Sequence, residues 1–521
     1  MFNVLEYIEA TVEKVPDKAA FCGENEVLTF SELHDAARGV GSYLAAQGIY
    51  KQPIAIFMEK SPSMIAAFLG VANAGCYYVP LDAEIPAFRI KLILETVRPA
   101  MIICDENTRD LLEKWEIGCE QSLAQNESEL FPPHERNTSI VLFSEAAACR
   151  VDDVALMAIR EKAIDADPLY IVFTSGSTGT PKGVIATHRS VIDYVENLSK
   201  ILQVDEDTVF GLQSPLYLDA CLKEVCNTLK FGATTFFVPK SLFMFPVKLI
   251  EYLNENKVNT ICWVASALGL VAGLGALDAV APAYLRTVAF GSEVFPIKHF
   301  NKWREVLPNA RFVHLYGPTE ATGMSAYYVA DRVFEEDEPI PIGRAFPNTE
   351  IILLTDDGQV PPLGQAGEIC IRGVGLSPGY FADEEKTRAV FVQNPLSATP
   401  DIVYKTGDLG FRGENGLLYF ISRRDHQIKH MGHRIELAEI EYVANRCEDV
   451  ELACAVFEAV KGKIVLYFIG SADKKSAVLA YLKENLPRYM VPHAVFPHEA
   501  LPLTPGGKIN RGLLLEEYNK K

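Results

Sequence analysis

The chain has 521 residues, 49% of them hydrophobic, which is enough apolar material for more than one domain core. Its 49 lysine and arginine residues are outnumbered by 68 aspartate and glutamate residues, giving a formal net charge of −19. Such an acidic excess argues against nucleic acid or an anionic membrane surface as a partner.

The sequence shows no clear membrane-spanning segment, secretory signal or disulfide pattern. The sequence contains no apolar run of about 18 residues, and its N-terminus carries acids where a secretory signal needs positive charge. The 11 cysteines are scattered and form no CxxC pair, which favours buried, reduced thiols over a disulfide framework or a zinc site. We therefore expect a cytoplasmic protein.

Helical and strand-like patterns alternate along the first 340 residues. Helical periodicity marks residues 30–48 and 61–75. Short apolar runs that read as buried strands are PIAIFM, AMIIC, LYIVF, NTICWV and RTVAF. This alternation predicts an α/β fold with a largely parallel sheet.

The texture changes from about residue 340. The segment IPIGRAFPNTEIILLTDDGQVPPLGQAGEICIRG has short strands between Gly, Pro and Asp turns, which predicts a β-rich subdomain. We place a domain boundary near Asp425. Residues 1–424 then form a large N-terminal domain. Residues 425–521 form a small α+β domain, and their number is typical of a small independent domain.

A loop rich in small and hydroxyl residues follows one predicted strand. The strand LYIVF leads into TSGSTGTPKG, residues 174–183. Small residues let backbone N–H groups approach an anion, while hydroxyls and Lys182 add donors and charge, so the segment predicts a phosphate-binding loop. It does not match the Walker pattern GxxxxGK[ST].

This loop resembles the signature of the adenylate-forming superfamily, which includes acyl-CoA synthetases, adenylation domains of nonribosomal peptide synthetases, luciferases and D-alanine–carrier protein ligases. The similarity extends over nearly the whole chain, because further family motifs follow in the family's order. They are LTFSEL, AGCYYVPLD, LYGPTE, GEICIRGVGLSPGY, YKTGDL, SRRDHQIKHMGHRIELAEIE, LPRYMVP and LPLTPGGKINR. The resemblance is strongest to stand-alone enzymes that adenylate amino acids.

The resemblance implies ATP and Mg²⁺ as cofactors and assigns residues to them. Tyr316 would stack on adenine, Asp408 would accept hydrogen bonds from the ribose hydroxyls, and Glu320 would bind Mg²⁺. Arg423 would contact ribose and phosphate, although a solvated salt bridge is the alternative. Phosphate contacts would come from Thr319 and the loop residues Thr174, Ser175, Gly176, Ser177, Thr178, Gly179 and Lys182.

The small domain would serve two half-reactions in turn. By resemblance, Lys508 reaches the acid and the α-phosphate during adenylation, where negative charge accumulates. Asp425 matches the family's hinge, and Gly432 lies on the loop that makes room for the pantetheine thiol. Together with Thr174, Lys182 and Glu320, Lys508 completes the predicted catalytic set.

The acyl pocket is predicted around residues 214–232. Asp219 falls where amino-acid-activating relatives pair an aspartate with the substrate ammonium, and a helix N-cap is the alternative. Lys223, one turn later, either pairs with Asp219 or receives an acidic substrate side chain. By alignment with the family, the remaining lining is small and mixed: Ala220, Ser266, Ala289, Gly291, Leu315, Gly323 and Met324.

Two departures from the family pattern affect detail. His314 stands where peptide-synthetase relatives commonly have asparagine, and Gly291-Ser292-Glu293 replaces a usual Gly-Gly-Glu. The sequence predicts ATP-dependent activation of a small amino acid and its transfer to the phosphopantetheine thiol of a separate carrier protein or to coenzyme A. An acidic amino acid leads, with D-alanine or another small neutral one next. An acyl-CoA synthetase for a small non-amino acid is the alternative.

Overall fold

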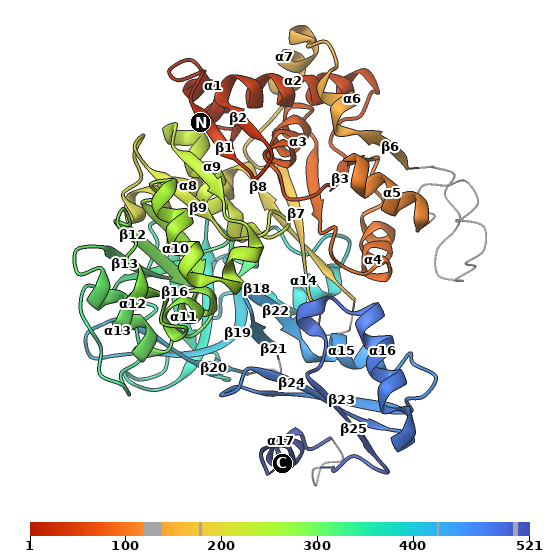
Figure 1. The fold of residues 1–521 in the computed structure, drawn as a ribbon, viewed down its shortest axis with the longest axis vertical. Coiled ribbons are helices and arrows are strands. Elements are labelled where there is room, and N and C mark those ends of the chain that lie inside the picture. Colours follow the sequence, from red (N-terminus) through yellow and green to blue (C-terminus); the bar gives the residue numbers. More distant parts are fainter. Residues whose placement is uncertain (116, 118–137, 177–179, 425–426, 504–508, 521) are drawn as a thin grey trace. The chain divides into compact units, whose positions relative to one another are not determined.

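The computed structural model describes residues 1–115, 117, 138–176, 180–424, 427–503 and 509–520. The chain forms two compact units, and Figure 1 gives their elements. The first unit contains Met1–Ala83, Val97–Val172 and Val184–Ser422; the second contains Glu84–Thr96, Phe173–Gly183 and Arg423–Lys521. Both units mix helices with strands, which confirms the predicted α/β class.

The largest sheet of the first unit has, among the described residues, the strand order β15-β14-β13-β12-β11-β9-β10-β1-β2. The strands from β13 to β1 run parallel, and β14, β15 and β2 complete the edges in antiparallel fashion. The bounds are β1 (Ala19–Cys22), β2 (Val27–Thr29), β9 (Val209–Leu212), β10 (Thr234–Phe237), β11 (Thr260–Val264), β12 (Thr287–Gly291), β13 (Arg311–Tyr316), β14 (Ala326–Val329) and β15 (Arg344–Ala345).

The two faces of this sheet differ in side-chain size. Trp263 and Phe290 point into a core built with the helices α10 to α13. Their neighbours Cys262 and Ala289 point to the opposite face, because successive strand residues alternate. That second face packs with α8 and α9. The helix bounds are α8 (His188–Leu202), α9 (Leu222–Phe231), α10 (Pro246–Glu255), α11 (Ala265–Gly273), α12 (Ala276–Ala279) and α13 (Ile297–Val306).

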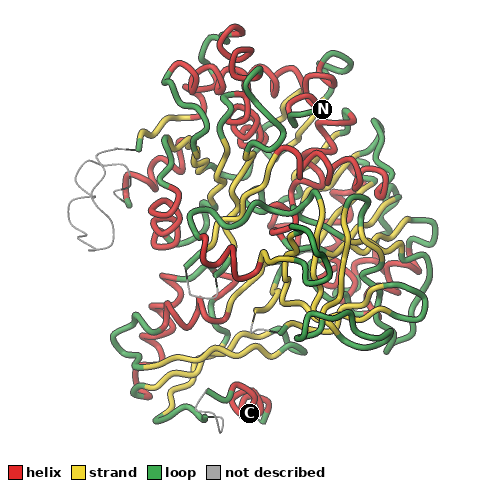
Figure 2. The backbone as a smooth tube through the Cα atoms, turned by 180° about the vertical axis from the view of Figure 1, so that it is seen from behind, coloured by secondary structure: helices red, strands yellow, loops and turns green. Residues whose placement is uncertain are grey.

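A second, six-stranded sheet has the order β6-β5-β3-β4-β7-β8. Its strand β3 is buried at every position, as expected of a parallel strand with both faces covered. The helices α2 and α3 pack closely on each other, and Figure 2 shows strands enclosed by helices in this part of the chain. The bounds are β3 (Pro53–Phe57), β4 (Tyr77–Leu81), β5 (Met101–Cys104), β6 (Ser139–Leu142), β7 (Pro168–Thr174), β8 (Lys182–Thr187), α1 (Leu5–Val12), α2 (Phe30–Ala46), α3 (Pro62–Asn73), α5 (Glu106–Lys114), α6 (Phe143–Ala147) and α7 (Asp153–Arg160).

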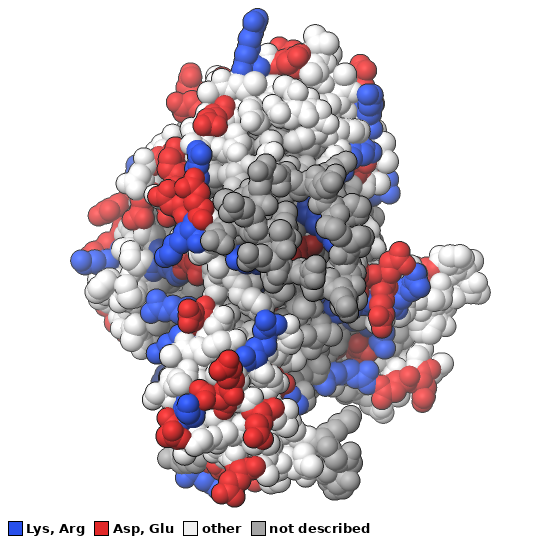
Figure 3. All heavy atoms as spheres, turned by 90° about the vertical axis from the view of Figure 1, so that its right-hand side faces the viewer, with Lys and Arg blue, Asp and Glu red and all other residues white. Residues whose placement is uncertain are grey.

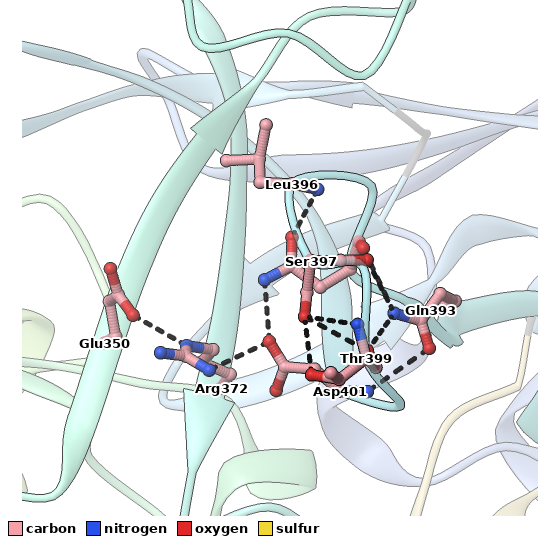
Figure 4. Close-up of polar contacts among 8 residues, drawn as sticks. Glu350, Arg372, Gln393, Leu396, Ser397, Thr399 and Asp401 are labelled. Atoms are coloured by element: carbon pink, nitrogen blue, oxygen red, sulfur yellow. Dashed lines mark hydrogen bonds and ion pairs between the residues drawn. The ribbon is translucent and has the colours of Figure 1, made fainter.

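The third sheet of this unit is antiparallel. It contains β16 (Thr349–Leu354), β17 (Gly367–Gly373), β18 (Phe391–Gln393), β19 (Ile402–Arg412) and β20 (Leu418–Arg423), and α14 (Glu384–Val390) precedes β18. Polar contacts stabilise the loop that precedes β19, as Figure 4 shows. Asp401 accepts from Arg372 at 2.8 Å, and Arg372 donates in turn to Glu350 at 2.6 Å. These groups stabilise a connection between strands.

The second unit is organised on the sheet β23-β24-β25. The helices α15 and α16 cover one face of this sheet and α17 covers the other, as seen in Figure 1. The helix α4 joins this unit through a buried ion pair between Arg89 and Glu439. The bounds are α4 (Ala87–Val97), α15 (Leu437–Ala444), α16 (Lys475–Asn485), α17 (Arg511–Asn519), β21 (Gln427–His430), β22 (His433–Glu436), β23 (Leu452–Glu458), β24 (Lys463–Ile469) and β25 (Ala494–His498).

The surface view in Figure 3 shows acidic and basic side chains interspersed over one face. None of the helices among the described residues has the length and apolar character needed to cross a bilayer. The ten described cysteines form no disulfide, and nine of them are buried.

Candidate functional site

Tyr316 and Asp408 come together in the first unit, although 92 residues separate them in the sequence. Tyr316 ends β13, and its hydroxyl donates to Asp408 Oδ2 at 2.6 Å. Asp408 lies within β19, and its side chain is 3% exposed. The predicted adenine and ribose contacts are therefore held in a fixed relation by a charge-assisted hydrogen bond.

Glu320 is the predicted magnesium ligand, and its side chain is fully buried. It lies in the short helical turn η3 (Thr319–Ala321), and its Oε1 accepts from the Tyr380 hydroxyl at 2.8 Å. A hard carboxylate suits Mg²⁺, which usually takes one or two protein carboxylates together with waters and substrate phosphates. The described residues contain no group of three or more His, Cys, Asp or Glu arranged around a metal position. Glu320 thus fits a magnesium site that is completed by phosphate oxygens.

The predicted phosphate loop falls in the second unit. The Thr174 hydroxyl is buried and has no hydrogen-bond partner among the described residues. Ser175 Oγ donates to the Arg434 carbonyl at 2.6 Å and accepts from the Glu436 N–H at 3.2 Å. An added Cβ on Gly176 would lie 2.0 Å from the Thr180 carbonyl oxygen, so only glycine fits there. Lys182 begins β8, whereas Ser177, Thr178 and Gly179 lie outside the described residues.

The remaining C-terminal predictions are only partly described. Arg423 is the last residue of β20. Asp425 and Lys508 lie outside the described residues. Gly432 follows Met431 in the two-residue turn that joins β21 to β22, and both have positive φ angles, of 79° and 52°. The positive φ of this turn favours glycine, so the hairpin itself is sufficient to explain Gly432.

The predicted acid pocket lies at the carboxyl ends of parallel strands in the first unit, where ligands bind in open α/β sheets. Gly291 ends β12 opposite Leu315 of β13, and Ser266 follows β11. An added Cβ on Gly291 would lie 2.2 Å from the Leu315 carbonyl oxygen. Gly323, at φ 85°, faces the Tyr194 ring, since a Cβ there would lie 3.4 Å from that ring. The side chains of Ala289 and Met324 are also buried.

Asp219 opens the turn η1 (Asp219–Cys221), which continues into α9. Its Oδ2 is buried without a hydrogen-bond partner among the described residues. Burial raises the pKa of Asp219, while the Thr319 hydroxyl and the Lys223 ammonium oppose that rise. The proximity of Thr319 and Glu320 to this carboxyl links the acid pocket to the predicted phosphate and metal contacts.

The two alternatives for Asp219 and Lys223 are not observed. Cys221 is the N-cap of α9, and this cap has no side-chain hydrogen bond, so Asp219 does not cap the helix. The described contacts include no hydrogen bond or ion pair between Asp219 and Lys223. Lys223 is 5% exposed, so an ammonium without an ion-pair partner is placed among buried groups.

Comparison with known proteins identifies the family of the chain. Residues 8–381 match the model of the family described as AMP-binding enzyme. The chain belongs to this AMP-binding enzyme family. The match ends before Asp408, so the predicted ribose contact and the stretch Arg423–Lys521 of the second unit lie beyond it.

Relatives of very different length share this AMP-binding region. Bacitracin synthase 1 from Bacillus licheniformis is 32% identical over 98% of this chain, but the chain spans only 9% of that protein. D-alanine–D-alanyl carrier protein ligase from Bacillus mycoides (strain KBAB4) is 29% identical, with 99% of both chains covered. Among solved structures, o-succinylbenzoate CoA synthetase from Bacillus subtilis has 21% identity and a TM-score of 0.80, covering 99% of this chain and 98% of its own. This last likeness supports the fold.

Within this AMP-binding chain, the two departures have structural consequences. The His314 ring stacks on Phe290 at 4.9 Å, and its Nδ1 hydrogen-bonds the Pro341 carbonyl at 2.8 Å. Ser292 has a φ of 66°, a left-handed conformation that favours glycine over residues with a Cβ. Its neighbour Glu293 accepts a hydrogen bond from the Ser266 N–H at 3.0 Å, which fixes the loop next to the pocket.

Sequence reasoning missed the buried polar groups behind the pocket of this AMP-binding enzyme. Glu224 is fully buried, and neither carboxylate oxygen has a hydrogen-bond partner among the described residues. Asn227 is also fully buried, and its side-chain carbonyl oxygen is likewise without one. The segment LKEVCNTL shows the polar residues at 223, 224, 227 and 228, but no local pattern marks them as buried, because their burial follows from the packing of α9 between core elements.

Proposed function

We propose that the chain activates a small amino acid with ATP and transfers the aminoacyl group to the phosphopantetheine thiol of a carrier protein. In the first step a substrate carboxylate oxygen attacks the α-phosphorus, the bond to pyrophosphate breaks, and an aminoacyl-AMP forms. In the second step the thiol sulfur attacks the acyl carbon, AMP leaves, and the thiol proton passes to solvent. The relative with full coverage in both directions, named as a carrier protein ligase, supports this partner.

The observation that carries the amino-acid proposal is the Asp219 carboxylate, whose buried Oδ2 has no hydrogen-bond partner in the described part of the chain. A buried carboxylate without a counter-charge is costly, and a substrate ammonium supplies one. Asp219 lies close enough to Glu320 for the two carboxyls to influence each other, so the bound amino acid would reach the predicted phosphate contacts.

The other residues have complementary roles in this proposal. Tyr316 stacks on adenine, and Asp408 accepts from the ribose hydroxyls. Bound Mg²⁺, held by Glu320, supplies neutralisation of charge on the phosphates. Lys182 and Lys508 place positive charge where negative charge accumulates during attack, with Thr174 as a hydroxyl donor. In the second step Asp425 acts as the hinge and Gly432 lines the thiol path.

The side chain of the substrate is proposed to be acidic, with aspartate and glutamate as leading candidates. Lys223 supports this because its ammonium lies one turn after Asp219, near enough to oppose the rise that burial causes in the pKa of that carboxyl, while the described contacts include no ion pair between them. Asp219 would then bind the substrate ammonium and Lys223 its side-chain carboxylate. D-alanine or another small neutral amino acid is the alternative, since Ala220, Ala289 and Gly323 leave little bulk in the lining.

The test is substrate-dependent exchange of pyrophosphate into ATP across a panel of amino acids and of acids without an amino group. Strong exchange with an aspartate or glutamate enantiomer, lost selectively in Lys223→Ala, supports the acidic substrate. Exchange with D-alanine, unchanged in ranking by Lys223→Ala, supports the neutral alternative. Preference for an acid without an amino group refutes both and indicates an acyl-CoA synthetase. A parallel assay with holo carrier protein and with coenzyme A identifies the acceptor.

A further inference from the structure

Behind the predicted acid pocket, α9 carries a carboxyl that the proposed reaction does not use. Glu224 is fully buried, and both its oxygens are without a hydrogen-bond partner among the described residues. An ionised carboxylate in such a position is strongly disfavoured, whereas a protonated one is tolerated. The preceding residue is Lys223, the proposed receptor of the substrate side chain.

The groups around Glu224 come from several elements. Lys223 lies on the same helix, Lys60 follows β3, Cys262 belongs to β11, Tyr194 to α8, and Cys221 to η1. Lys60 is already engaged, because its Nζ donates to the carbonyls of Leu212 and Gln213 at 3.2 and 3.3 Å. Neither lysine forms an ion pair with Glu224 within the described contacts.

The protonation state of Glu224 determines the net charge next to Lys223. An ionised Glu224 would oppose the Lys223 ammonium from within the protein, so an acidic substrate would gain little from that lysine. A neutral Glu224 leaves the ammonium uncompensated, and the substrate carboxylate then becomes its counter-charge. We propose that Glu224 is a specificity-determining residue that is neutral at neutral pH and thereby reserves Lys223 for an acidic side chain. This inference rests on the proposed function.

The direction of the pH effect follows from burial. Burial raises the pKa of Glu224 to about 8, against the opposing influence of Lys223 and Lys60. The neutral, protonated form of Glu224 therefore predominates at neutral pH. As the pH rises through that value, Glu224 loses its proton to solvent and becomes ionised. Preference for an acidic amino acid should be present below about pH 8 and decline above it, by up to about tenfold from about pH 7 to about pH 9.

The experiment measures kcat/KM in pyrophosphate exchange for the preferred acidic amino acid and for its amide, from neutral to alkaline pH. Their ratio cancels effects common to both substrates. In the wild type we expect the ratio to fall several-fold as the pH rises. In Glu224→Gln, which keeps the shape and is permanently neutral, the ratio should be independent of pH. Glu196→Gln is the matched control, because Glu196 is a paired carboxylate on α8, and it should keep the wild-type profile.

A second readout does not depend on turnover. The protonated carboxyl of Glu224 should contribute an infrared C=O stretching band at neutral pH that disappears at alkaline pH and is absent in Glu224→Gln. A wild type with no preference for acid over amide at neutral pH overturns the acidic substrate and the selective role of Glu224 together. A clear preference with identical pH profiles in the wild type and Glu224→Gln overturns this inference alone. If the variant does not fold, a wild-type band that fails to titrate overturns it.

Discussion

Two regions of the first unit bury carboxylates in opposite ways. On the predicted nucleotide side, Asp408 and Glu320 each accept a hydrogen bond from a tyrosine, at 2.6 and 2.8 Å. On the predicted amino-acid side, Asp219 and Glu224 have buried oxygens without partners among the described residues. The first arrangement is complete within the protein. In the second, Asp219 lacks a counter-charge within the described contacts, and Glu224, in its proposed protonated form, needs none.

This difference assigns a different role to each region: the predicted nucleotide side is preorganised, and the predicted amino-acid side is selective. Hydrogen-bonded carboxylates are held in place before the ligand arrives, which reduces the ordering cost of binding. Unpartnered buried charges stabilise a ligand only if it brings the missing charge, so they discriminate strongly against ligands that lack it. The chain thus combines a generic nucleotide region with a pocket whose energy depends on the substrate.

The largest expected effect is on the pocket side. Asp219→Asn keeps the shape but removes the proposed counter-charge of the substrate ammonium. Breaking a buried charge pair costs about 3–5 kcal/mol, which corresponds to a loss of roughly a hundredfold to several thousandfold in kcat/KM for amino acids. Exchange assays measure this, with the KM for ATP as the internal control. An equal loss for the matching acid without its amino group would contradict the assignment.

The next effect concerns the nucleotide side. Asp408→Ala removes the acceptor proposed for the ribose hydroxyls, and hydrogen bonds to a charged group contribute about 1.5–3 kcal/mol. The KM for ATP should rise roughly tenfold to a hundredfold, with little change in the KM for the amino acid. Steady-state exchange at varied ATP concentration checks this. An unaltered KM for ATP would show that Asp408 has another role.

A smaller effect should follow from Tyr316→Phe. This variant keeps the aromatic face for adenine and removes only the hydrogen bond to Asp408. Because this hydrogen bond positions Asp408 and does not itself contact ATP, only part of its contribution reaches ATP binding, and the KM for ATP should rise about tenfold or less. Comparison with Tyr316→Ala separates the two functions of the ring. If the phenylalanine and alanine variants are equally impaired, stacking on adenine is refuted.

The smallest effect is on stability. Ser292→Gly relieves a left-handed backbone that costs a residue with a Cβ about 1–2 kcal/mol. Part of this gain is offset by the greater freedom of glycine in the unfolded chain, about 0.4–1 kcal/mol. We expect the free energy of unfolding to rise by about 0.5–1 kcal/mol, read from denaturant unfolding. A destabilised variant would indicate that the Ser292 side chain makes a favourable contact.

The sequence predicted the fold class and the grouping of several site residues. Apolar runs such as NTICWV form strands with both faces covered, and the unbroken run of apolar residues, without alternation, indicates this burial. The motifs LYGPTE and YKTGDL were assigned to one nucleotide site, and the structure joins them through Tyr316 and Asp408. The roles proposed for these residues stay predictions.

Other features depend on distant contacts that a local pattern does not contain. Glu224 looks like one more charged residue on a helix, and its burial follows only from the packing of α9 against α1, α8 and the sheet. The ion pair of Arg89 with Glu439 joins residues 350 positions apart, so no spacing rule reveals it. The inclusion of α4 in the second unit has the same origin.

The hydrogen bonds of Ser175 carry one further consequence. A single hydroxyl has one proton to donate, and here that proton is given to the Arg434 carbonyl of β22. If the Ser175 hydroxyl donated to a phosphate oxygen instead, its hydrogen bond to the Arg434 carbonyl would be lost. Binding of nucleotide at the loop would then compete with the contact between Ser175 and strand β22. By thermodynamic reciprocity, each interaction would lower the equilibrium constant of the other by the same factor. Because one hydrogen bond contributes about 0.5–1.5 kcal/mol, Ser175 would make nucleotide binding and the contact of the hairpin with the loop compete by roughly tenfold or less.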